Sequence, residues 1–559
     1  MLDITTFGAC GNDGSDTTPA VRKALAACRE NGAERLVFPE GRYDFRPDQA
    51  MESYCFISNN DEGLKRIAFP LFGLEDIEID GQGSQFVFHG FMSPFVIDRS
   101  SGVTLRGFSV DVERTFHSEA IILARHEDGM EVEIPEAYPY HILNGILTFT
   151  DGTPGRGAVE YPYGGLLEFD AKRRETAYQA RDYWAWSGLA ARDLGGRRVR
   201  LFHATLKGTP GNVMVFGAGS RSHPGIFVTD CCEVRIENVT IHHCGGMGII
   251  AQRTRNVAVD HCSVTPTPGT DRILSATADA THFVNCTGHI ELGHCLFENQ
   301  KDDATNIHGL YMQIARVPAP NELLVQFKHR QQFGIDFIEP GTRLEVVDGD
   351  SMNTIGEVDV EGVERLNNEF TRVRIRDSAG VGLKPGQAVG LLRDYPEIHI
   401  HDCVIRHNRA RGILLNCRGK TLVENNHFHT PGAAVLFEGD ARFWFEQGGV
   451  RDCRIVNNLF DTCNFGVWGR ATIDVKTGID EACRAHSRYN RNIVIEDNTF
   501  RVYDDGRIVF AYSIDNLTIR NNRREKVHVD AYPPRPAPPQ LLDITDCDRV
   551  IVEGNEGIV

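Results

Sequence analysis

A six-residue pattern recurs along this chain and constrains its fold more than any other feature. Its positions read apolar, any, polar, small or Asn, any, apolar. At the fourth position of the pattern, Cys403 and Asn426 are 23 residues apart, and Asn498 and Asn522 are 24 apart. Repeats of this length are typical of solenoids, in which each repeat forms one coil stacked on the next. The pattern occupies residues 105–110, 236–241, 259–264, 400–405, 423–428, 455–460, 495–500 and 519–522.

This pattern suits the coil of a parallel β-helix. Alternating apolar residues of a strand point to one side, here the inside of the tube. A buried Asn repeated at one position can hydrogen-bond to its counterparts in the coils above and below. An antiparallel sandwich of short strands is the alternative, and the recurring coil length argues against it. We therefore predict an all-β fold, a right-handed parallel β-helix.

Three segments depart from the pattern. Asp16 to Pro19 resembles a helix start, and an amphipathic helix after it predicts an N-terminal cap over the open end of the solenoid. Two stretches of alternating strands predict small β-subdomains inserted at loop positions, where insertions cost little. The expected division is 1–111 for the cap and first coils, 112–210 for the first insert, 211–310 for the central coils, 311–395 for the second insert and 396–559 for the C-terminal coils.

The charge balance bears on the partners of the protein. The chain carries 59 Lys and Arg against 77 Asp and Glu, a formal net charge of −18. We expect no nucleic acid partner, because phosphates select basic surfaces and no basic run occurs. A neutral sugar is compatible with this charge, whereas a polyuronate would be repelled. No window of 18 apolar residues occurs, so we expect no membrane span.

Cysteine usage and the first residues bear on the compartment. The 15 cysteines are odd in number and lack paired spacing, which favours a reducing compartment and packing roles. No four-ligand zinc spacing occurs, so we predict no metal site. Met1 to Ile4 runs directly into folded sequence without a signal peptide. The expected location is cytoplasmic, or secreted or periplasmic if a leader was removed. The oligomeric state stays open, with a homodimer among the alternatives.

Residues 275–309 are richest in candidate functional side chains. Within them, the stretch that begins at Ala278 is echoed 24 residues later, about one coil further along. Asp279 and Asp303 are therefore predicted to stack on adjacent coils, about 4.8 Å apart at the backbone. Asp302 would face the other way in an ideal strand. A bend or bulge is needed to bring it into the same cleft.

The three clustered carboxylates define the predicted chemistry. Like charges this close repel one another, so at least one pKa should be raised. Acid and base catalysis on a glycosidic bond requires one protonated and one ionised carboxyl group. We predict Asp279, Asp302 and Asp303 as catalytic. The structural alternative is a set of surface aspartates that cap turns beside a calcium site.

Other polar and aromatic residues are candidates for binding substrate. Arg409 and Arg411 follow one repeat cysteine at nearly the spacing at which Asp302 and Asp303 follow another, so they should lie one coil beyond the aspartates. An arginine paired with a carboxylate would hold it charged. Every candidate has a structural alternative, such as a packed Trp or a buried, satisfied His. The candidates are Arg221, His223, His282, Asn306, His308, Arg409, Arg411, Glu438, Trp444 and Glu446, with Trp184 and Trp186 as further aromatic residues of the first insert.

The chain resembles glycoside hydrolase family 110, the bacterial α-1,3-galactosidases that act on terminal galactose. The resemblance covers nearly the whole chain and includes the order of the inserts. It implies a β-helix with inserted β-barrel-like subdomains, terminal α-galactosyl glycans as substrates, no cofactor or metal, an inverting mechanism and export. It rests on residues 41–50, 77–90, 222–228, 275–309 and 437–449.

The same resemblance implies roles for the three aspartates. Asp302 is the general acid, and Asp279 or Asp303 is the base. Two charged neighbours should raise the pKa of Asp302 and keep it protonated near neutral pH. Linear Gal-α-1,3-Gal and the fucose-branched blood-group B determinant both remain candidate substrates.

Three functions compete at this point. The first is an exo-acting, inverting α-galactosidase. The second is another β-helix carbohydrate enzyme, a polygalacturonase or pectate lyase, which the N-terminal segment would also suit. The third is a non-catalytic, glycan-binding solenoid of the tailspike kind. A panel of nitrophenyl glycosides separates the three.

Overall fold

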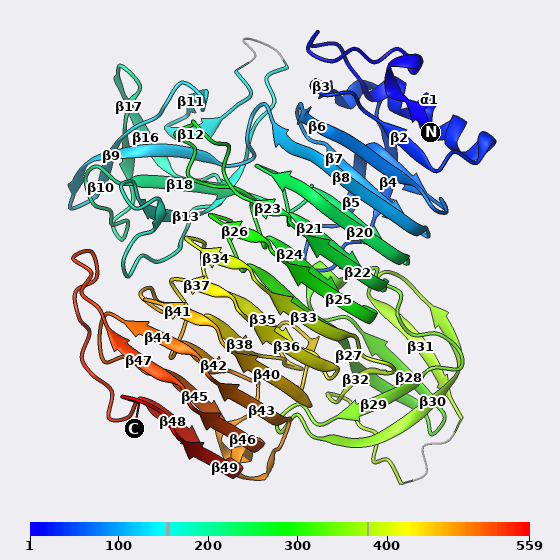
Figure 1. The fold of residues 1–559 in the computed structure, drawn as a ribbon, viewed down its shortest axis with the longest axis vertical. Helices are drawn as coiled ribbons and strands as arrows, with labels where there is room; N and C mark the ends of the chain where they lie inside the picture. The colour runs from blue at the N-terminus through cyan, green and yellow to red at the C-terminus, as the bar shows by residue number, and fades with distance from the viewer. Residues whose placement is uncertain (153–156, 377–379, 559) are drawn as a thin grey trace.

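The computed structural model describes residues 1–152, 157–376 and 380–558. Figure 1 shows a single solenoid in which parallel strands stack from the N-terminal end to the C-terminal end. One parallel sheet carries β2 (Arg35–Val37), β3 (Arg42–Phe45), β6 (Glu78–Phe88), β8 (Ser101–Val112), β20 (Cys232–Ile241), β22 (Arg255–Asp260), β23 (Ser263–Val264), β25 (Thr287–Gly293), β26 (Leu296–Glu298), β33 (Glu397–His401), β34 (Val404–Arg406), β36 (Lys420–Glu424), β37 (His427–His429), β40 (Asp452–Val456), β41 (Leu459–Asp461), β43 (Asn490–Glu496), β44 (Thr499–Val502), β46 (Ile514–Arg520), β47 (Arg523–Lys526) and β49 (Asp548–Glu553).

A second set of parallel strands closes the other side of the tube. It carries β5 (Gly63–Phe72), β7 (Ser93–Asp98), β19 (Ile226–Thr229), β21 (Ile249–Gln252), β24 (Thr281–Val284), β27 (Thr305–Ala319), β35 (Ile413–Asn416), β38 (Val435–Phe437), β42 (Ile473–Val475), β45 (Val509–Tyr512) and β48 (Leu542–Thr545). The predicted all-β fold, a parallel β-helix, is confirmed.

The six-residue pattern forms a bend in each coil. Its third position adopts a left-handed backbone conformation, with φ of 53° at Asp402, 58° at Asn425 and 56° at Asp497. This region is sparsely populated by most residues, and Asn, Asp and Gly occupy it more readily. The polar third position is therefore a backbone requirement, and in the coils from β22 onward it splits the strand into two segments, as in β36 and β37.

The fourth position of the pattern forms a ladder of buried side chains. The Nδ2 group of Asn426 donates to Oδ1 of Asn458 at 3.0 Å, and Asn458 donates to Asn498 at 3.0 Å. Asn498 donates to Asn522 at 3.0 Å, and Asn522 donates to Asn555 at 2.9 Å. Each buried amide is thus satisfied by its neighbour, as buried polar groups require. The predicted asparagine ladder is confirmed.

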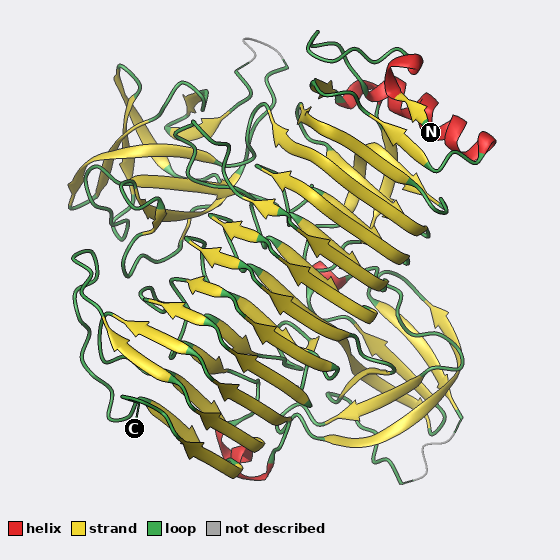
Figure 2. Cartoon of the chain, viewed as in Figure 1, coloured by secondary structure: helices red, strands yellow, loops and turns green. Residues whose placement is uncertain are grey.

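A short helical region covers the N-terminal end of the tube. Helix α1 (Thr18–Asn31) buries Val21, Leu25 and Cys28 against the first coils and ends at Gly32. In Figure 2 it is the long red helix at the N-terminal end of the solenoid. The predicted capping helix is confirmed. Short 3₁₀ helices also occur at Ile4–Phe7, Pro47–Gln49, Arg330–Gln332 and Glu481–His486, and none of the described helices is long and apolar enough to cross a membrane.

The first insert leaves the solenoid after β8 and returns at β19. Its antiparallel strands pack around an apolar core of their own. The last of them, β18, pairs with β9 and β13, so the insert's sheet continues past residue 210. The strands are β9 (Ser118–His126), β10 (Gly129–Glu133), β11 (Tyr140–Leu143), β12 (Ile146–Phe149), β13 (Tyr163–Asp170), β14 (Glu175–Thr176), β15 (Tyr183–Trp184), β16 (Ala190–Gly195), β17 (Arg198–Phe202) and β18 (Val213–Ala218).

The second insert grows directly from a coil strand. The N-terminal part of β27 pairs with coil strands β24 and β35, and its C-terminal part pairs with β28 and β32. The antiparallel pairings β27–β28, β28–β31, β30–β31, β29–β30, β29–β32 and β27–β32 close a barrel. The further strands are β28 (Glu322–Gln326), β29 (Arg343–Val347), β30 (Thr354–Arg365), β31 (Phe370–Ile375) and β32 (Ala388–Leu392). In Figure 1 the two inserts lie on opposite flanks of the solenoid.

Candidate active site

The coil register brings the three aspartates together. Thr281 of β24 pairs with Thr305 of β27, and the N–H of Ala280 donates to the carbonyl oxygen of Asp303 at 3.0 Å. Asp279 and Asp303 therefore precede paired strands at equivalent positions, as the 24-residue echo predicts. The chain bends at Asp302 rather than continuing as a strand.

The three carboxyl groups are buried and close. Asp279, Asp302 and Asp303 are 3%, 7% and 2% exposed. One oxygen of each lies within 4.8 Å of an oxygen of the other two. Three unshielded negative charges at this distance would repel strongly, so protons or cations have to compensate them.

Arginines compensate Asp302. Its Oδ1 lies 2.7 Å from Nη1 of Arg409 and 3.9 Å from Nη2 of Arg411, and its Oδ2 accepts a hydrogen bond from Arg221. Burial alone would raise the pKa of Asp302, but the charges of Arg409, Arg221 and Arg411 outweigh it and hold that pKa well below its usual range. The prediction of a raised pKa at Asp302 is wrong for the free site, because the charges of three arginines outweigh the repulsion from the neighbouring aspartates.

Asp303 has one arginine of its own. The guanidinium of Arg411 donates to both of its oxygens, at 2.8 and 2.6 Å, and the backbone N–H of Arg411 donates at 3.0 Å. Burial raises the pKa of Asp303 to about 7, and the charge and two-pronged pairing of Arg411 oppose that rise. The sequence prediction that Arg409 and Arg411 lie one coil beyond the aspartates is confirmed by these contacts and by the pairing of Thr305 with Ile413.

Asp279 has a histidine in place of an arginine. Its Oδ2 lies 2.8 Å from Nδ1 of His282. Burial, followed by the charge of Asp302, raises the pKa of Asp279 to about 7. Asp279 is therefore the carboxyl group of the three with the strongest geometric reason to hold a proton.

The histidines beside Asp279 support the same protonation state. Burial lowers the pKa of His282 to about 3 and that of His308 well below its usual value, so both rings are neutral. Nδ1–H of His308 donates to the carbonyl of Gly309 at 2.7 Å, which leaves its Nε2 to accept from Nε2–H of His282 at 2.9 Å. Nδ1 of His282 is then an acceptor, and the hydrogen bond requires the proton on Asp279.

Asn306 and Glu446 lie beside this relay. Glu446 on β39 (Glu446–Gln447) lies 3.5 Å from Nε2 of His308 and accepts hydrogen bonds from Asn306 at 3.3 Å and from Asn59 at 2.8 Å. Burial, followed by the charge of Glu438, raises the pKa of Glu446 to about 8. Strand β39 pairs with β27 where the second insert begins, so this insert positions Glu446.

The remaining candidates lie outside this hydrogen-bond network. His223 packs between Phe91 and Phe116, with ring centroids 5.8 and 5.5 Å away. Glu438 pairs with Lys476 at 3.2 Å. Trp444 is half-buried, and its ring centroid lies 4.6 Å from that of His329.

Sequence reasoning missed two charged residues at the site. Asp182 of the first insert accepts from Arg409, with Nη2 at 2.8 Å. No repeat spacing links Asp182 to the coils, so only the folded insert reveals it. Lys301 immediately precedes Asp302, and its adjacency to the aspartates was the available signal.

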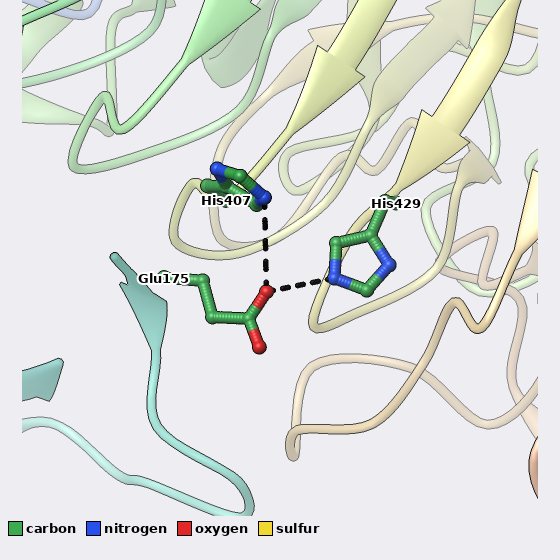
Figure 3. Close-up of side chains that lie close together, drawn as sticks. All are labelled: Glu175, His407 and His429. Carbon is green, nitrogen blue, oxygen red and sulfur yellow. Dashed lines mark hydrogen bonds and ion pairs between the residues drawn. The ribbon is translucent and has the colours of Figure 1, made fainter. Parts of the chain in front are cut away.

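A second cluster of ionisable groups joins the first insert to the solenoid (Figure 3). Oε2 of Glu175 lies 2.8 Å from Nε2 of His429 and 3.8 Å from Nε2 of His407. Arg173 and Tyr532 also donate to Glu175. Two histidines and a carboxylate are a donor set that suits zinc, but a guanidinium already shares this carboxylate. At the aspartates, a metal ion would compete with three arginines.

Comparison with known proteins identifies the family. The family model described as GLAA-B beta-barrel domain I matches residues 118–214, domain II matches 322–389, and the right handed beta helix region matches 367–528. Alpha-1,3-galactosidase A of Shewanella woodyi is 35% identical, over 100% of this chain and 91% of the relative. Alpha-1,3-galactosidase B of Bacteroides thetaiotaomicron is 30% identical, over the same shares of the two chains. The chain belongs to glycoside hydrolase family 110.

Membership of family 110 confirms the recognition made from the motifs. The helix match agrees with the predicted right-handed coil, and the two barrel matches fall on the two inserts. The polygalacturonase, pectate lyase and tailspike alternatives are set aside by relatives that align along the whole chain.

Proposed function

We propose that the protein is an exo-acting, inverting glycoside hydrolase that releases terminal α-1,3-linked galactose. The names of its full-length relatives support the substrate class. The observation that carries the chemistry is the difference between the partners of Asp279 and those of Asp302 and Asp303. Arginines pair with Asp302 and Asp303, whereas Asp279 bonds to a neutral histidine, so we assign the catalytic proton to Asp279 in the free site. Hydrolysis with inversion needs one acid and one base.

The shared proton can serve either role of the pair. Asp302 is the proposed acid, which protonates the departing glycosidic oxygen, and Asp279 is the proposed base. Asp279 carries the proton in the free site, so the proton has to pass to Asp302 when substrate binds. The nearest oxygens of the two are within 4.8 Å, a distance that one water molecule bridges. Asp279 is then ionised, and its burial, the largest cause of its raised pKa, keeps it a suitable base.

This assignment requires Asp302 to exchange its partners. It can accept the proton only after its contacts with Arg221 and Arg409 are weakened. Sugar hydroxyl groups are suitable replacement partners for these guanidinium groups. An inverting pair is typically about 6.5–9.5 Å apart, so Asp302 also has to move away from Asp279 to admit the attacking water.

Both inserts support action at chain ends. An open β-helix groove suits internal cleavage of a polymer, whereas a pocket with walls on several sides suits one terminal sugar. Asp182 of the first insert contacts Arg409, and Glu446 is held where the second insert begins. The first insert thus contributes a residue beside the aspartates, and the start of the second insert holds Glu446 next to the histidines that contact Asp279.

Product analysis tests the proposal. Gal-α-1,3-Gal is hydrolysed in an NMR tube, and the anomeric protons of galactose are followed from the first minutes. We expect free β-galactose before mutarotation, and no larger fragments from a longer glycan. First-formed α-galactose contradicts inversion. Release of internal oligosaccharides without galactose contradicts exo action.

A further inference from the structure

Two exposed tryptophans lie on the first insert and have no role in the proton chemistry. The rings of Trp184 and Trp186 stack, with centroids 5.1 Å apart and planes inclined by 18°. They are nevertheless 56% and 65% exposed. Large aromatic side chains are mostly buried, and exposed apolar surface that is held in place indicates a binding site.

Glycines fix the position of this pair. A β-carbon at position 165 would lie 3.1 Å from Cζ3 of Trp184, and one at position 164 would lie 3.1 Å from Cζ3 of Trp186. The two indole rings therefore lie close against the bare backbone of Gly164 and Gly165 in β13. Strand β15 pairs with the same stretch, Gly165 with Trp184. The stacked pair of Trp184 and Trp186, here called the platform, is therefore supported by a sheet.

A short chain of contacts connects the platform to the aspartates. Asp182 lies two residues before Trp184 in the sequence, and its carboxylate pairs with Nη2 of Arg409 at 2.8 Å. Nη1 of Arg409 pairs with Asp302 at 2.7 Å. The platform therefore borders the side of the site where Asp302, the proposed acid, meets the leaving group.

Lys301 lies between the platform and Asp302. A β-carbon at position 165 would lie 3.4 Å from its Nζ, and one at Gly217 would lie within 2.7 Å of its Cδ, Cε and Nζ. The Lys301 side chain therefore lies directly against the backbone of Gly217 and reaches Gly165. The ammonium makes no hydrogen bond or ion pair with any residue that the structure describes, so its donors are free for a ligand.

We propose that Trp184, Trp186 and Lys301 form the binding subsite for the sugar on the leaving-group side of the scissile bond. This inference rests on the proposed function. The C–H face of a pyranose stacks on the indole rings, and the ammonium donates to a ring hydroxyl. The galactose then lies at the aspartates, and the insert selects what the galactose is attached to.

Two substrates separate this subsite from the position of the galactose at the aspartates. Gal-α-1,3-Gal fills both, whereas α-galactosyl fluoride has no sugar beyond the scissile bond. For Trp184→Ala we expect kcat/KM on the disaccharide to fall about 10-fold or more, and on the fluoride by less than about 2-fold. Trp184→Ala/Trp186→Ala should widen this gap. Phe202→Ala removes another exposed aromatic of the same insert and should change neither value.

Lys301→Met keeps the length of the side chain and removes its charge. We expect it, too, to lower kcat/KM on the disaccharide more than on the fluoride. Equal losses on both substrates in the tryptophan variants overturn the subsite, and unchanged disaccharide kinetics do so as well. Retained fluoride hydrolysis shows that each variant is folded. If the wild-type protein hydrolyses neither substrate, the proposed function itself fails, and this inference fails with it.

Discussion

The carboxyl group of Asp279 lies 2.8 Å from Nδ1 of His282, and the other ring nitrogen of His282 lies 2.9 Å from His308. The end of this relay is fixed by a backbone carbonyl, that of Gly309. A main-chain group therefore sets the tautomer of two histidines, and through them it favours a proton on Asp279.

This placement predicts a pH dependence of activity. The raised pKa of Asp279, about 7, means that the cluster loses its shared proton as the pH rises through that value. Without this proton no carboxyl group can protonate the leaving group. We expect kcat/KM for Gal-α-1,3-Gal to decline above about pH 7, measured in buffers from pH 5 to 9. A flat profile up to pH 9 would contradict the shared proton.

Glu175 predicts a pH dependence of stability. Although burial alone would raise it, the pKa of Glu175 is lowered to about 2 by His429, Arg173 and Tyr532. A carboxylate whose pKa is lowered by folding stabilises the fold at pH values above its unfolded-state pKa, about 4.5. This contribution is lost as the pH falls towards the folded-state pKa of about 2. We expect Glu175→Gln to lower Tm clearly at pH 7 and progressively less below about pH 4.5.

The control for Glu175 is an exposed carboxylate. Glu361 pairs with Arg376 at 3.4 Å on the surface of the second insert. Glu361→Gln should shift Tm little at any pH, because exposed ion pairs contribute about 0–1 kcal/mol. If Glu175→Gln lowers Tm at pH 7 no more than Glu361→Gln does, the cluster in Figure 3 does not stabilise the packing of the insert on the solenoid.

The asparagine ladder predicts an asymmetry between neighbouring residues. Asn458 is buried and donates to Val423, Val456 and Asn498, whereas Asn457 is part of an exposed pair. Asn458→Ala leaves the buried partners of Asn458 without a hydrogen bond, so we expect a loss of about 2 kcal/mol or more in unfolding free energy. Asn457→Ala should cost far less. Urea denaturation of the two variants measures the difference, and equal losses would count against the ladder.

Metal removal gives a further expected outcome. Arg221, Arg409 and Arg411 already compensate the aspartates, so the proposed chemistry uses protons alone. Activity should survive exhaustive dialysis against a chelator. A loss that calcium or zinc restores would refute this and assign an ion to one of the two clusters.

The coil repeat allowed most of the fold to be predicted. The spacing of 23 and 24 residues gave the stacking, and the echo of Asp279 at Asp303 gave the core of the site. Both predictions follow because each coil contributes one residue to each position of the repeat, so residues one repeat apart stack. The left-handed third position explains why Asn, Asp and Gly recur there.

The charge state of Asp302 could not be predicted in the same way. Arg221 precedes a coil strand without belonging to the six-residue pattern, and Asp182 comes from the first insert. Such contacts depend on where an insert folds back, and no periodicity records that. The tautomer of His282 depends on the hydrogen bond from His308 to the carbonyl oxygen of Gly309, which is likewise a property of the folded chain.

The most direct test of the account assigns the acid. Asp279→Asn, Asp302→Asn and Asp303→Asn are compared on Gal-α-1,3-Gal and on dinitrophenyl α-galactoside, whose leaving group departs without a proton. We expect Asp302→Asn to lose about 100-fold or more on the disaccharide and far less on the activated substrate. Asp279→Asn should lose activity on both, because both need activated water. If Asp279→Asn is the lenient variant and Asp302→Asn is inactive on both substrates, the roles are reversed and the proposed proton transfer to Asp302 is wrong.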